Sequence, residues 1–263
     1  MIPAEYITQW RARAPWPTDR QVEQDLLLSR LIVEIANDPM LGSELAFRGG
    51  TCFHKLFMAQ PLRYSEDLDY VRVTRGPIGP IIEQLEVVAR RLDMTRHSYN
   101  HGSPMVQLYV STPSSTGARP IRIKIETNFV ETEPFFDRVT QPLVVDSRWF
   151  SGRGAVLTFR VEELLATKLR ALYQRRKGRD LFDLWCGLSL VNGIDDQAIV
   201  DAHRYCMGDQ VVAGRVIEVN VAQKLDRPDY SADIEQLVGA MPAAFTMPAA
   251  AALVKGRLLD RLS

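Results

Sequence analysis

The sequence predicts an α+β protein in which a mixed sheet flanked by helices is followed by a helical C-terminal part. Segments that alternate between apolar and polar side chains, as strands do, fall in the first 150 residues. Segments with apolar side chains at helical spacing lie among them, and from about Val161 onward the pattern is almost entirely helical. We therefore expect an α/β domain over residues 1–150 and a helical domain over residues 151–263.

The composition is that of an ordinary globular protein: 263 residues, 46% hydrophobic and 24% charged, with a formal net charge of zero. Non-specific coating of nucleic acid needs a strong positive field, so this balance argues against it but is compatible with a local basic patch. The N-terminus has no basic segment followed by an apolar one, and no apolar run approaches the ~18 residues that span a bilayer. We expect a cytoplasmic protein with no role at a membrane.

The first elements are a helix over about residues 18–37, then a short apolar strand, LAF, and a glycine turn. Gly49 and Gly50 form the turn, and Thr51 is expected to cap the helix that follows. The backbone N–H groups of such a turn, with the positive end of the helix, can hold phosphate. A glycine turn that merely begins a helix is at least as common.

The next strand, RYSEDLDYVRV, carries two carboxylates on one face. Alternation puts Ser65, Asp67 and Asp69 on the same side. Like charges at this spacing repel unless a cation compensates them, and Mg²⁺ prefers hard carboxylate oxygens together with substrate phosphates. The alternative is an exposed edge strand whose charges protect against aggregation.

A third carboxylate follows on a later strand. After a helix over about residues 78–92, the segments MVQLYVST and IRIKIETNF predict two strands, and in the second Arg122, Lys124 and Glu126 share one face. If this strand pairs with the acidic strand, Glu126 joins Asp67 and Asp69, and three carboxylates suit a site for two metal ions. The alternative is a solvated face of alternating charges.

The helix VEELLATKLRALYQRRKG places Lys168 in the middle of an apolar stripe, with Arg175 two turns further along it. Such a lysine either extends its ammonium to solvent or reaches phosphate oxygens in a cleft. Gly178 is expected to end this helix, and Asp180 to cap the next one with Asp183 in its first turn. The basic residues near the helix end either complement its dipole or contact a polyanion: Arg170, Arg175, Arg176, Lys177 and Arg179.

Other kinds of site find little support. The histidines and cysteines show no zinc-type spacing, and the sequence has no GxSxG, Walker A or GxGxxG motif. Hydrolase, P-loop and Rossmann chemistry are therefore disfavoured.

Five segments together resemble the AbiEii/AbiGii (MenT-like) nucleotidyltransferase toxins of type IV toxin–antitoxin systems, which belong to the DNA polymerase beta-like nucleotidyltransferase superfamily. In order, from about residue 47 to 185, they are FRGGTCFHKLF, RYSEDLDY, IKIE, LLATKLRALYQRR and RDLFDLW. The resemblance implies a polymerase-beta-like fold, with the glycine turn and the DxD strand as its first motif. One departure is Gly-Gly-Thr where the wider superfamily commonly has Gly-Ser.

The resemblance also assigns roles to residues. It implies a catalytic role for Asp67, Asp69, Glu126, Lys168, Asp180 and Asp183. It implies substrate binding by Gly49, Gly50, Thr51, Ser65, Arg175 and Arg179. Asp67, Asp69 and Glu126 would hold Mg²⁺, and whether Asp180 or Asp183 faces the site stays open.

The function implied is a toxin that transfers nucleotides from an NTP to an acceptor, in characterised relatives the 3′ end of tRNA, and so blocks translation. A cognate antitoxin would restrain it. Two alternatives stay open: a nucleotidyltransferase that modifies a protein or a small molecule, and a catalytically silent module that only binds nucleotide.

Overall fold

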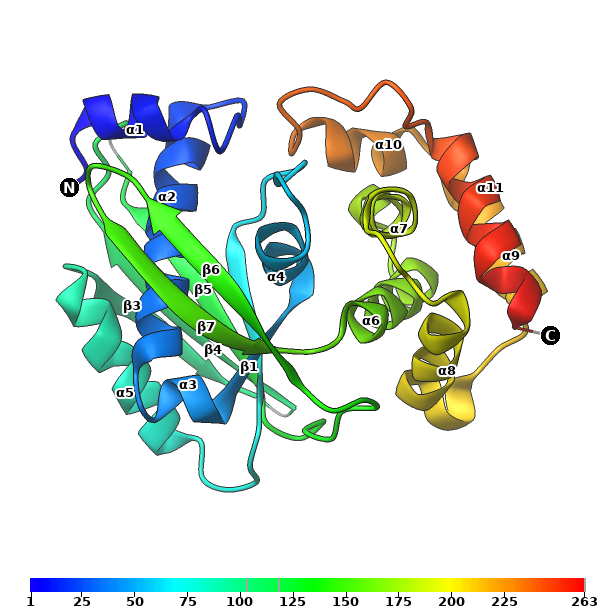
Figure 1. Ribbon diagram of the computed structural model, residues 1–263, viewed down its shortest axis with the longest axis horizontal. Coiled ribbons are helices and arrows are strands. Elements are labelled where there is room, and N and C mark those ends of the chain that lie inside the picture. Colours follow the sequence, from blue (N-terminus) through cyan, green and yellow to red (C-terminus); the bar gives the residue numbers. More distant parts are fainter. Residues whose placement is uncertain (103, 118, 263) are drawn as a thin grey trace. The chain divides into compact units, whose positions relative to one another are not determined.

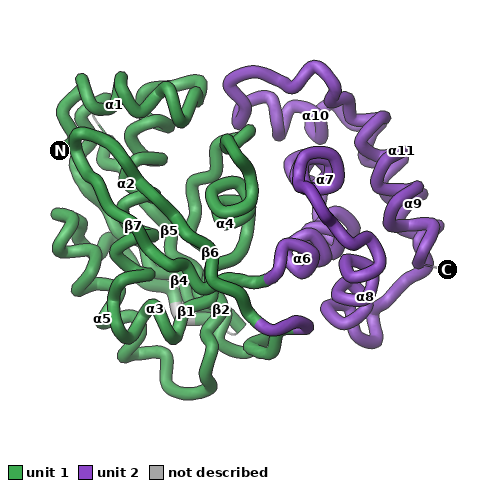
Figure 2. Tube along the Cα trace, viewed as in Figure 1, with its two compact units in different colours: residues 1–134, 138–159 green, residues 135–137, 160–263 purple. Residues whose placement is uncertain are grey.

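The computed structural model describes residues 1–102, 104–117 and 119–262. It divides into two compact units (Figure 2). The first comprises Met1–Pro134 and Arg138–Phe159, and the second comprises Phe135–Asp137 and Arg160–Ser263. Each unit is described by itself.

The first unit is built on a mixed sheet of seven strands in the order β3-β4-β5-β2-β1-β7-β6 (Figure 1). Two of the pairings, β1 with β7 and β2 with β5, are parallel, and the other four are antiparallel. The predicted mixed sheet is thus confirmed. The strands are β1 (Leu45–Arg48), β2 (Asp67–Arg72), β3 (Thr95–His101), β4 (Met105–Thr112), β5 (Ile121–Asn128), β6 (Val139–Asp146) and β7 (Ser151–Thr158).

Helices flank this sheet, and the longest of them lies across it (Figure 1). They are α1 (Ala4–Trp10), α2 (Asp19–Asn37), α3 (Leu41–Glu44), α4 (Gly49–Leu56) and α5 (Gly79–Arg91). A capping box begins α2, since the Thr18 hydroxyl accepts from the Gln21 backbone while the Gln21 side chain accepts from the Thr18 backbone. The apolar side chains of α2 are buried, and the helix packs against β5, β6 and β7.

A buried ion pair joins α2 to α4. The ammonium of Lys55 lies 3.0 Å from both carboxylate oxygens of Asp25 and donates to the hydroxyl of Ser29 at 2.9 Å. The Trp10 indole donates to the same carboxylate at 2.9 Å, which ties α1 to the pair. Because removing one partner would leave a buried charge uncompensated, this contact fixes α4, the helix that follows the glycine turn.

The second unit is helical, as predicted from Val161 onward. It contains α6 (Val161–Gln174), α7 (Gly178–Leu190), α8 (Asp196–Met207), α9 (Gly214–Leu225), α10 (Pro228–Glu235), α11 (Met247–Arg257) and the 3₁₀ turns η1 (Gly208–Gln210) and η2 (Leu259–Arg261). Helix α7 is buried along most of its length and packs against α6, α10 and α11. None of the helices in the described residues is long and apolar enough to cross a membrane.

Several predicted element boundaries were wrong. The helix after the turn begins at Gly49, so Thr51 lies inside it and Arg48 is the N-cap. Strand β2 begins at Asp67, which leaves Ser65 in the preceding segment. Gly178 does not end α6 but begins α7, and Lys177 holds the N-cap position predicted for Asp180. Asp183 accordingly lies beyond the first turn of α7.

Candidate active site

The pairing of β2 with β5 gathers the predicted carboxylates on one face of the sheet. In this parallel register Asp67 lies opposite Lys124 and Asp69 lies opposite Glu126. Side chains two residues apart on a strand share a face, so all three carboxylates point to the same side. Glu126 also accepts a hydrogen bond of 2.8 Å from Gln107 on β4. The structure therefore brings Glu126 to the same face of the sheet as Asp67 and Asp69.

Lys124 lies between two of these carboxylates. Its ammonium is 3.0 Å from Oδ2 of Asp67 and 3.4 Å from Oε2 of Glu126. Burial alone would lower the pKa of Lys124, but the carboxylates of Asp67 and Glu126 outweigh it and raise that pKa above its usual value. As arranged, no group of three or more His, Cys, Asp or Glu side chains among the described residues could hold a metal ion. The Lys124 ammonium is the cation that the described structure places beside Asp67 and Glu126.

The two aspartates are held in surroundings that disfavour their negative charge. Burial raises the pKa of Asp69, and the neighbouring carboxylate of Glu126 raises it further. Burial likewise raises the pKa of Asp67, although Lys124 opposes the effect. A cation placed on this face would relieve both costs, which is the electrostatic condition for a metal site.

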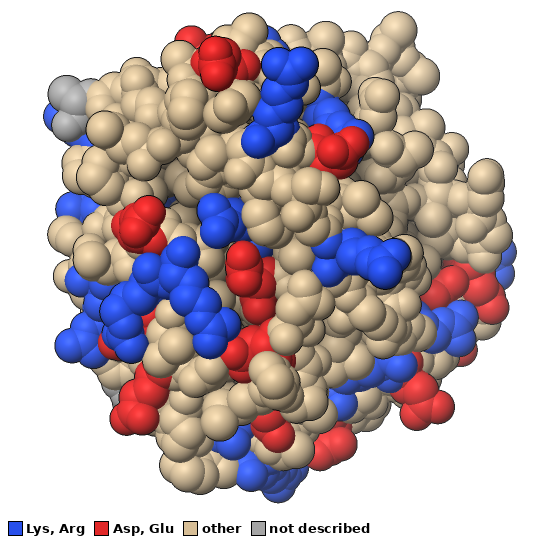
Figure 3. Space-filling view, turned by 60° about the vertical axis from the view of Figure 1, so that its left-hand side comes forward, with Lys and Arg blue, Asp and Glu red and all other residues tan. Residues whose placement is uncertain are grey.

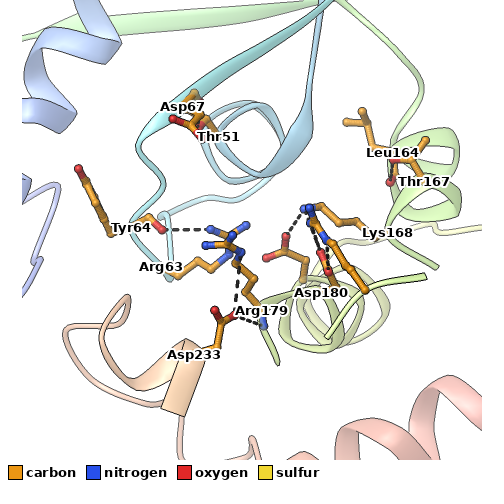
Figure 4. A network of polar contacts seen from close by, with 12 residues as sticks. Thr51, Arg63, Tyr64, Asp67, Leu164, Thr167, Lys168, Arg179, Asp180 and Asp233 are labelled. Carbon is orange, nitrogen blue, oxygen red and sulfur yellow. Dashed lines mark hydrogen bonds and ion pairs between the residues drawn. The ribbon is translucent and has the colours of Figure 1, made fainter. Parts of the chain in front are cut away.

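The glycine turn lies directly against this face. Gly49 has a φ of +83°, in the left-handed region that favours glycine, and a Cβ atom there would lie 2.2 Å from Oδ2 of Asp69. The backbone of Arg48 pairs with Asp69 in the sheet, and the hydroxyl of Thr51 donates to the backbone carbonyl of Asp67 at 2.6 Å (Figure 4). The turn and the DxD strand therefore form one rigid structure.

Arg63 lies beside the second glycine of the turn. A Cβ atom on Gly50 would lie 2.1 Å from Nη2 of Arg63, whose side chain is buried and donates to the backbone carbonyl of Tyr64 at 3.0 Å (Figure 4). This guanidinium places a positive charge at the first turn of α4. Ser65 is half-buried and lies before β2. The prediction that strand alternation places Ser65 on the carboxylate face was therefore wrong.

The second unit contains a separate buried charge cluster. The ammonium of Lys168 on α6 lies 2.8 Å from Oδ2 of Asp183 and 3.7 Å from Oδ1 of Asp180, and both aspartates are fully buried (Figure 4). Arg175 holds Asp180 through two hydrogen bonds of 2.6 Å. Lys168 therefore does not extend to solvent. Asp180 and Asp183 both lie beside its ammonium.

Several basic residues near the end of α6 have partners within the second unit. Lys177 and Arg179 lie 3.4 and 3.9 Å from Asp233 on α10, and Arg170 donates to the backbone carbonyl of Cys206 at 3.2 Å. One acid distant in sequence, Asp233, thus offsets part of the positive charge of the predicted basic cluster, which weakens the case for a polyanion site there.

Three residues at these sites were not predicted as functional. Lys124 had a usable signal, because it alternates with Glu126 on the strand that was expected to pair with β2. Arg63 and Asp233 had none, since only the fold brings Arg63 to Gly50 and Asp233 to Arg179.

The structure thus combines a glycine turn packed on a DxD strand with a third carboxylate on the neighbouring strand. The family described as "Nucleotidyl transferase AbiEii toxin, Type IV TA system" matches residues 30–255. The chain belongs to this family of nucleotidyltransferase toxins of type IV toxin–antitoxin systems.

Solved structures agree on the fold. The nucleotidyltransferase toxin MenT4 from Mycobacterium tuberculosis H37Rv superposes with a TM-score of 0.70 at 18% identity, over 100% of this chain and 91% of that one. JHP933 from Helicobacter pylori superposes with a TM-score of 0.58 at 14% identity, over 92% and 91% of the two chains. No curated protein sequence matches the chain significantly.

Replacing Gly49 by Ala tests the contact between the turn and Asp69. The new methyl group would meet the Asp69 carboxylate in a backbone conformation that costs about 1–2 kcal/mol for an L-residue. We expect loss of nucleotide transfer together with a moderate loss of stability, measured by chemical denaturation. Gly193→Ala is the matched control, since Gly193 has a φ of +73° and open space around it. If both variants lose stability equally and both stay active, the contact does not position Asp69.

Replacing Lys124 by Met tests whether its ammonium stands where a metal ion binds. Without it the three carboxylates repel one another, so we expect Mg²⁺ to raise the melting temperature more in the variant than in the wild type. A difference of about 1 kcal/mol corresponds to roughly 2–4 °C for a chain of this size. Arg122→Met is the control, because Arg122 lies on the same face of β5. Equal responses to Mg²⁺ in all three proteins would contradict the assignment.

Proposed function

We propose that the chain uses Mg²⁺ to transfer nucleotides from an NTP to the 3′ end of tRNA, and that this reaction blocks translation. The family establishes a nucleotidyltransferase toxin, which implies an NTP substrate and an antitoxin. The observation that carries the proposal further is the single face shared by Asp67, Asp69 and Glu126.

By their donor chemistry the carboxylates on this face fit a divalent metal, which would replace the Lys124 ammonium beside Asp67. Carboxylates are hard oxygen ligands, and one or two of them together with substrate phosphates satisfy Mg²⁺. Burial makes the charges of Asp67 and Asp69 costly without a cation, which favours its binding. When bound, two such ions would activate the attacking hydroxyl and neutralise the leaving pyrophosphate. We assign Asp67, Asp69 and Glu126 as the ligands.

The glycine turn is the proposed phosphate site. The first N–H groups of α4, at Gly49, Gly50 and Thr51, have no partner within the helix and lie at its positive end. The buried guanidinium of Arg63 beside Gly50 adds positive charge at the same place. We propose that this turn contacts the triphosphate, with Ser65 as a further substrate contact from the segment before β2.

For the second unit we propose that Lys168 contacts the triphosphate and stabilises the charge that develops during transfer. An ammonium has three donors, so contact with Asp183 and Asp180 leaves capacity for a phosphate oxygen. Asp180 and Asp183 would then be positioning residues that hold the ammonium. Arg175 and Arg179 stay proposed substrate contacts, although each lies beside an aspartate.

The proposed acceptor is the 3′ end of an RNA. The ion pairs with Asp233 remove part of the case for RNA binding near the end of α6. A nucleotidyltransferase that modifies a protein or a small molecule is the second candidate. Incubating the protein with each labelled NTP, Mg²⁺, and total RNA or total protein reports the donor and the acceptor together. We propose that the reaction takes place in the cytoplasm, with residues 1–150 as the nucleotidyltransferase domain and 151–263 as the helical domain.

Replacing Asp67 or Asp69 by Asn should abolish transfer while the fold is retained. Metal ions supply several kcal/mol of stabilisation to such transition states, so the loss should be about a thousandfold or more. The measurement is incorporation of labelled NTP into RNA, with circular dichroism as the check on folding. Near wild-type activity of either variant at saturating Mg²⁺ would refute the assignment of metal ligands.

Replacing Lys168 by Ala should lower the turnover number by about two orders of magnitude, the effect of removing one electrostatic contact to the transition state. It should also lower stability, because two buried carboxylates lose their cation. Asp183→Asn separates the effects, since it leaves the ammonium in place and should reduce turnover less. If Lys168→Ala is destabilised but turns over normally, Lys168 has a structural role only.

A further inference from the structure

A groove in the first unit carries positive charge beside the carboxylate face. It has a volume of about 520 Å³ and is lined by Arg20, Gln24, Glu66, Arg119, Pro120 and Arg122. On the face shown in Figure 3, Lys and Arg side chains are interspersed with Asp and Glu, as expected for a chain of zero net charge. Three arginines with a single acid, Glu66, are therefore a local departure from this mixture.

Hydrogen bonds from side chains of α2 to backbone carbonyls fix the walls of this groove. Arg20, on the first turn of α2, donates to the backbone carbonyls of Arg119 and Pro120, each at 2.7 Å. Gln24, one turn further along α2, donates to the carbonyl of Arg122 at 3.1 Å and to that of Glu66 at 3.4 Å. These contacts join α2, the start of β5 and the segment before β2. The acceptors are neutral carbonyls, and among residues 1–102, 104–117 and 119–262 Arg20 forms no ion pair.

The other two arginines face solvent. Arg119 and Arg122 are both exposed, and within the described residues neither forms an ion pair. Many arginines of this unit do pair with acids, as Arg72 does with Glu44 and Arg96 with Glu86. Exposed guanidinium groups without an acid partner are well suited to bind phosphate, which they can contact through two donors.

The position of the groove relates it to the proposed chemistry. Arg122 lies two residues before Lys124 on the same face of β5, so its Cα atom is about 7 Å further along the strand. Glu66 directly precedes Asp67. A sugar–phosphate backbone could therefore extend from the groove to the carboxylates along this face of the first unit.

We propose that this groove binds the sugar–phosphate backbone of the RNA acceptor, just before the 3′ hydroxyl that is presented to Asp67 and Asp69. The assignment rests on the proposed transfer to RNA. It adds a binding site for that substrate, with Arg119 and Arg122 as phosphate contacts and Arg20 as the residue that holds the wall of the groove.

The test is the double variant Arg119→Gln/Arg122→Gln in the full chain. Binding of fluorescently labelled, unfractionated tRNA is measured by anisotropy without NTP, over a series of salt concentrations. Each phosphate contact contributes about 0.7 to the salt slope for a single strand, so the slope should fall by about 1.4 and the affinity by about tenfold at 0.15 M salt. Binding of NTP with Mg²⁺, measured by calorimetry, should not change.

The matched control is Arg75→Gln/Arg153→Gln, which removes the same charge at two exposed arginines of the first unit that lie outside the groove. It should change the salt slope little. The proposal is overturned if this control weakens RNA binding as much, or if the groove variant binds RNA like the wild type. It is also overturned if the groove variant loses NTP affinity alone, because the groove would then hold the triphosphate.

This binding measurement separates the two proposals. If the groove variant transfers nucleotides to RNA with unchanged binding, the groove assignment fails while the proposed function stands. If RNA binding depends on the groove but the wild type transfers nothing to RNA, the proposed function fails while the groove stands.

Discussion

The parallel register between β2 and β5 is the constraint on which the proposed active site depends. A shift of one residue in this pairing would move Glu126 to the opposite face from Asp67 and Asp69. The register also sets Lys124 opposite Asp67, so the same pairing that gathers three negative charges brings the positive charge that makes them tolerable. Without a cation, burial of these carboxylates would oppose folding.

The second unit solves a similar electrostatic problem in a different way. Asp180 and Asp183 are fully buried, and Lys168 and Arg175 supply the compensating charges at short distance. All four come from α6 and α7 and the turn between them, so one helical hairpin builds the cluster. The buried carboxylates of each cluster therefore have basic partners from the same unit.

Patterns along the chain predicted most of the fold and the carboxylates of the site. Strand alternation identified Asp67, Asp69 and Glu126, and helical spacing placed Lys168 on a buried stripe, because both patterns record burial directly. Strands β3, β6 and β7 were missed. TRHSYNH has almost no apolar residues to alternate with polar ones, and TQPLVVD and SGRGAVLT contain proline or glycine, which are uncommon inside strands. The end of α6 was misjudged because Gly178 was interpreted as a stop signal, whereas it lies where Tyr230 leaves no room for a side chain. Contacts between distant segments, such as Asp233 with Lys177, have no signature in local sequence.

The packing of Gly49 on Asp69 couples two positions that differ in chemistry and lie twenty residues apart. Any side chain at position 49 would displace the carboxylate, and any larger acid at position 69 would press on the turn. A side chain at position 49 therefore requires a smaller residue at position 69. In relatives that have lost the activity, a small residue at position 69 would leave room for a side chain at position 49. Substitution at both positions would therefore indicate an inactive toxin.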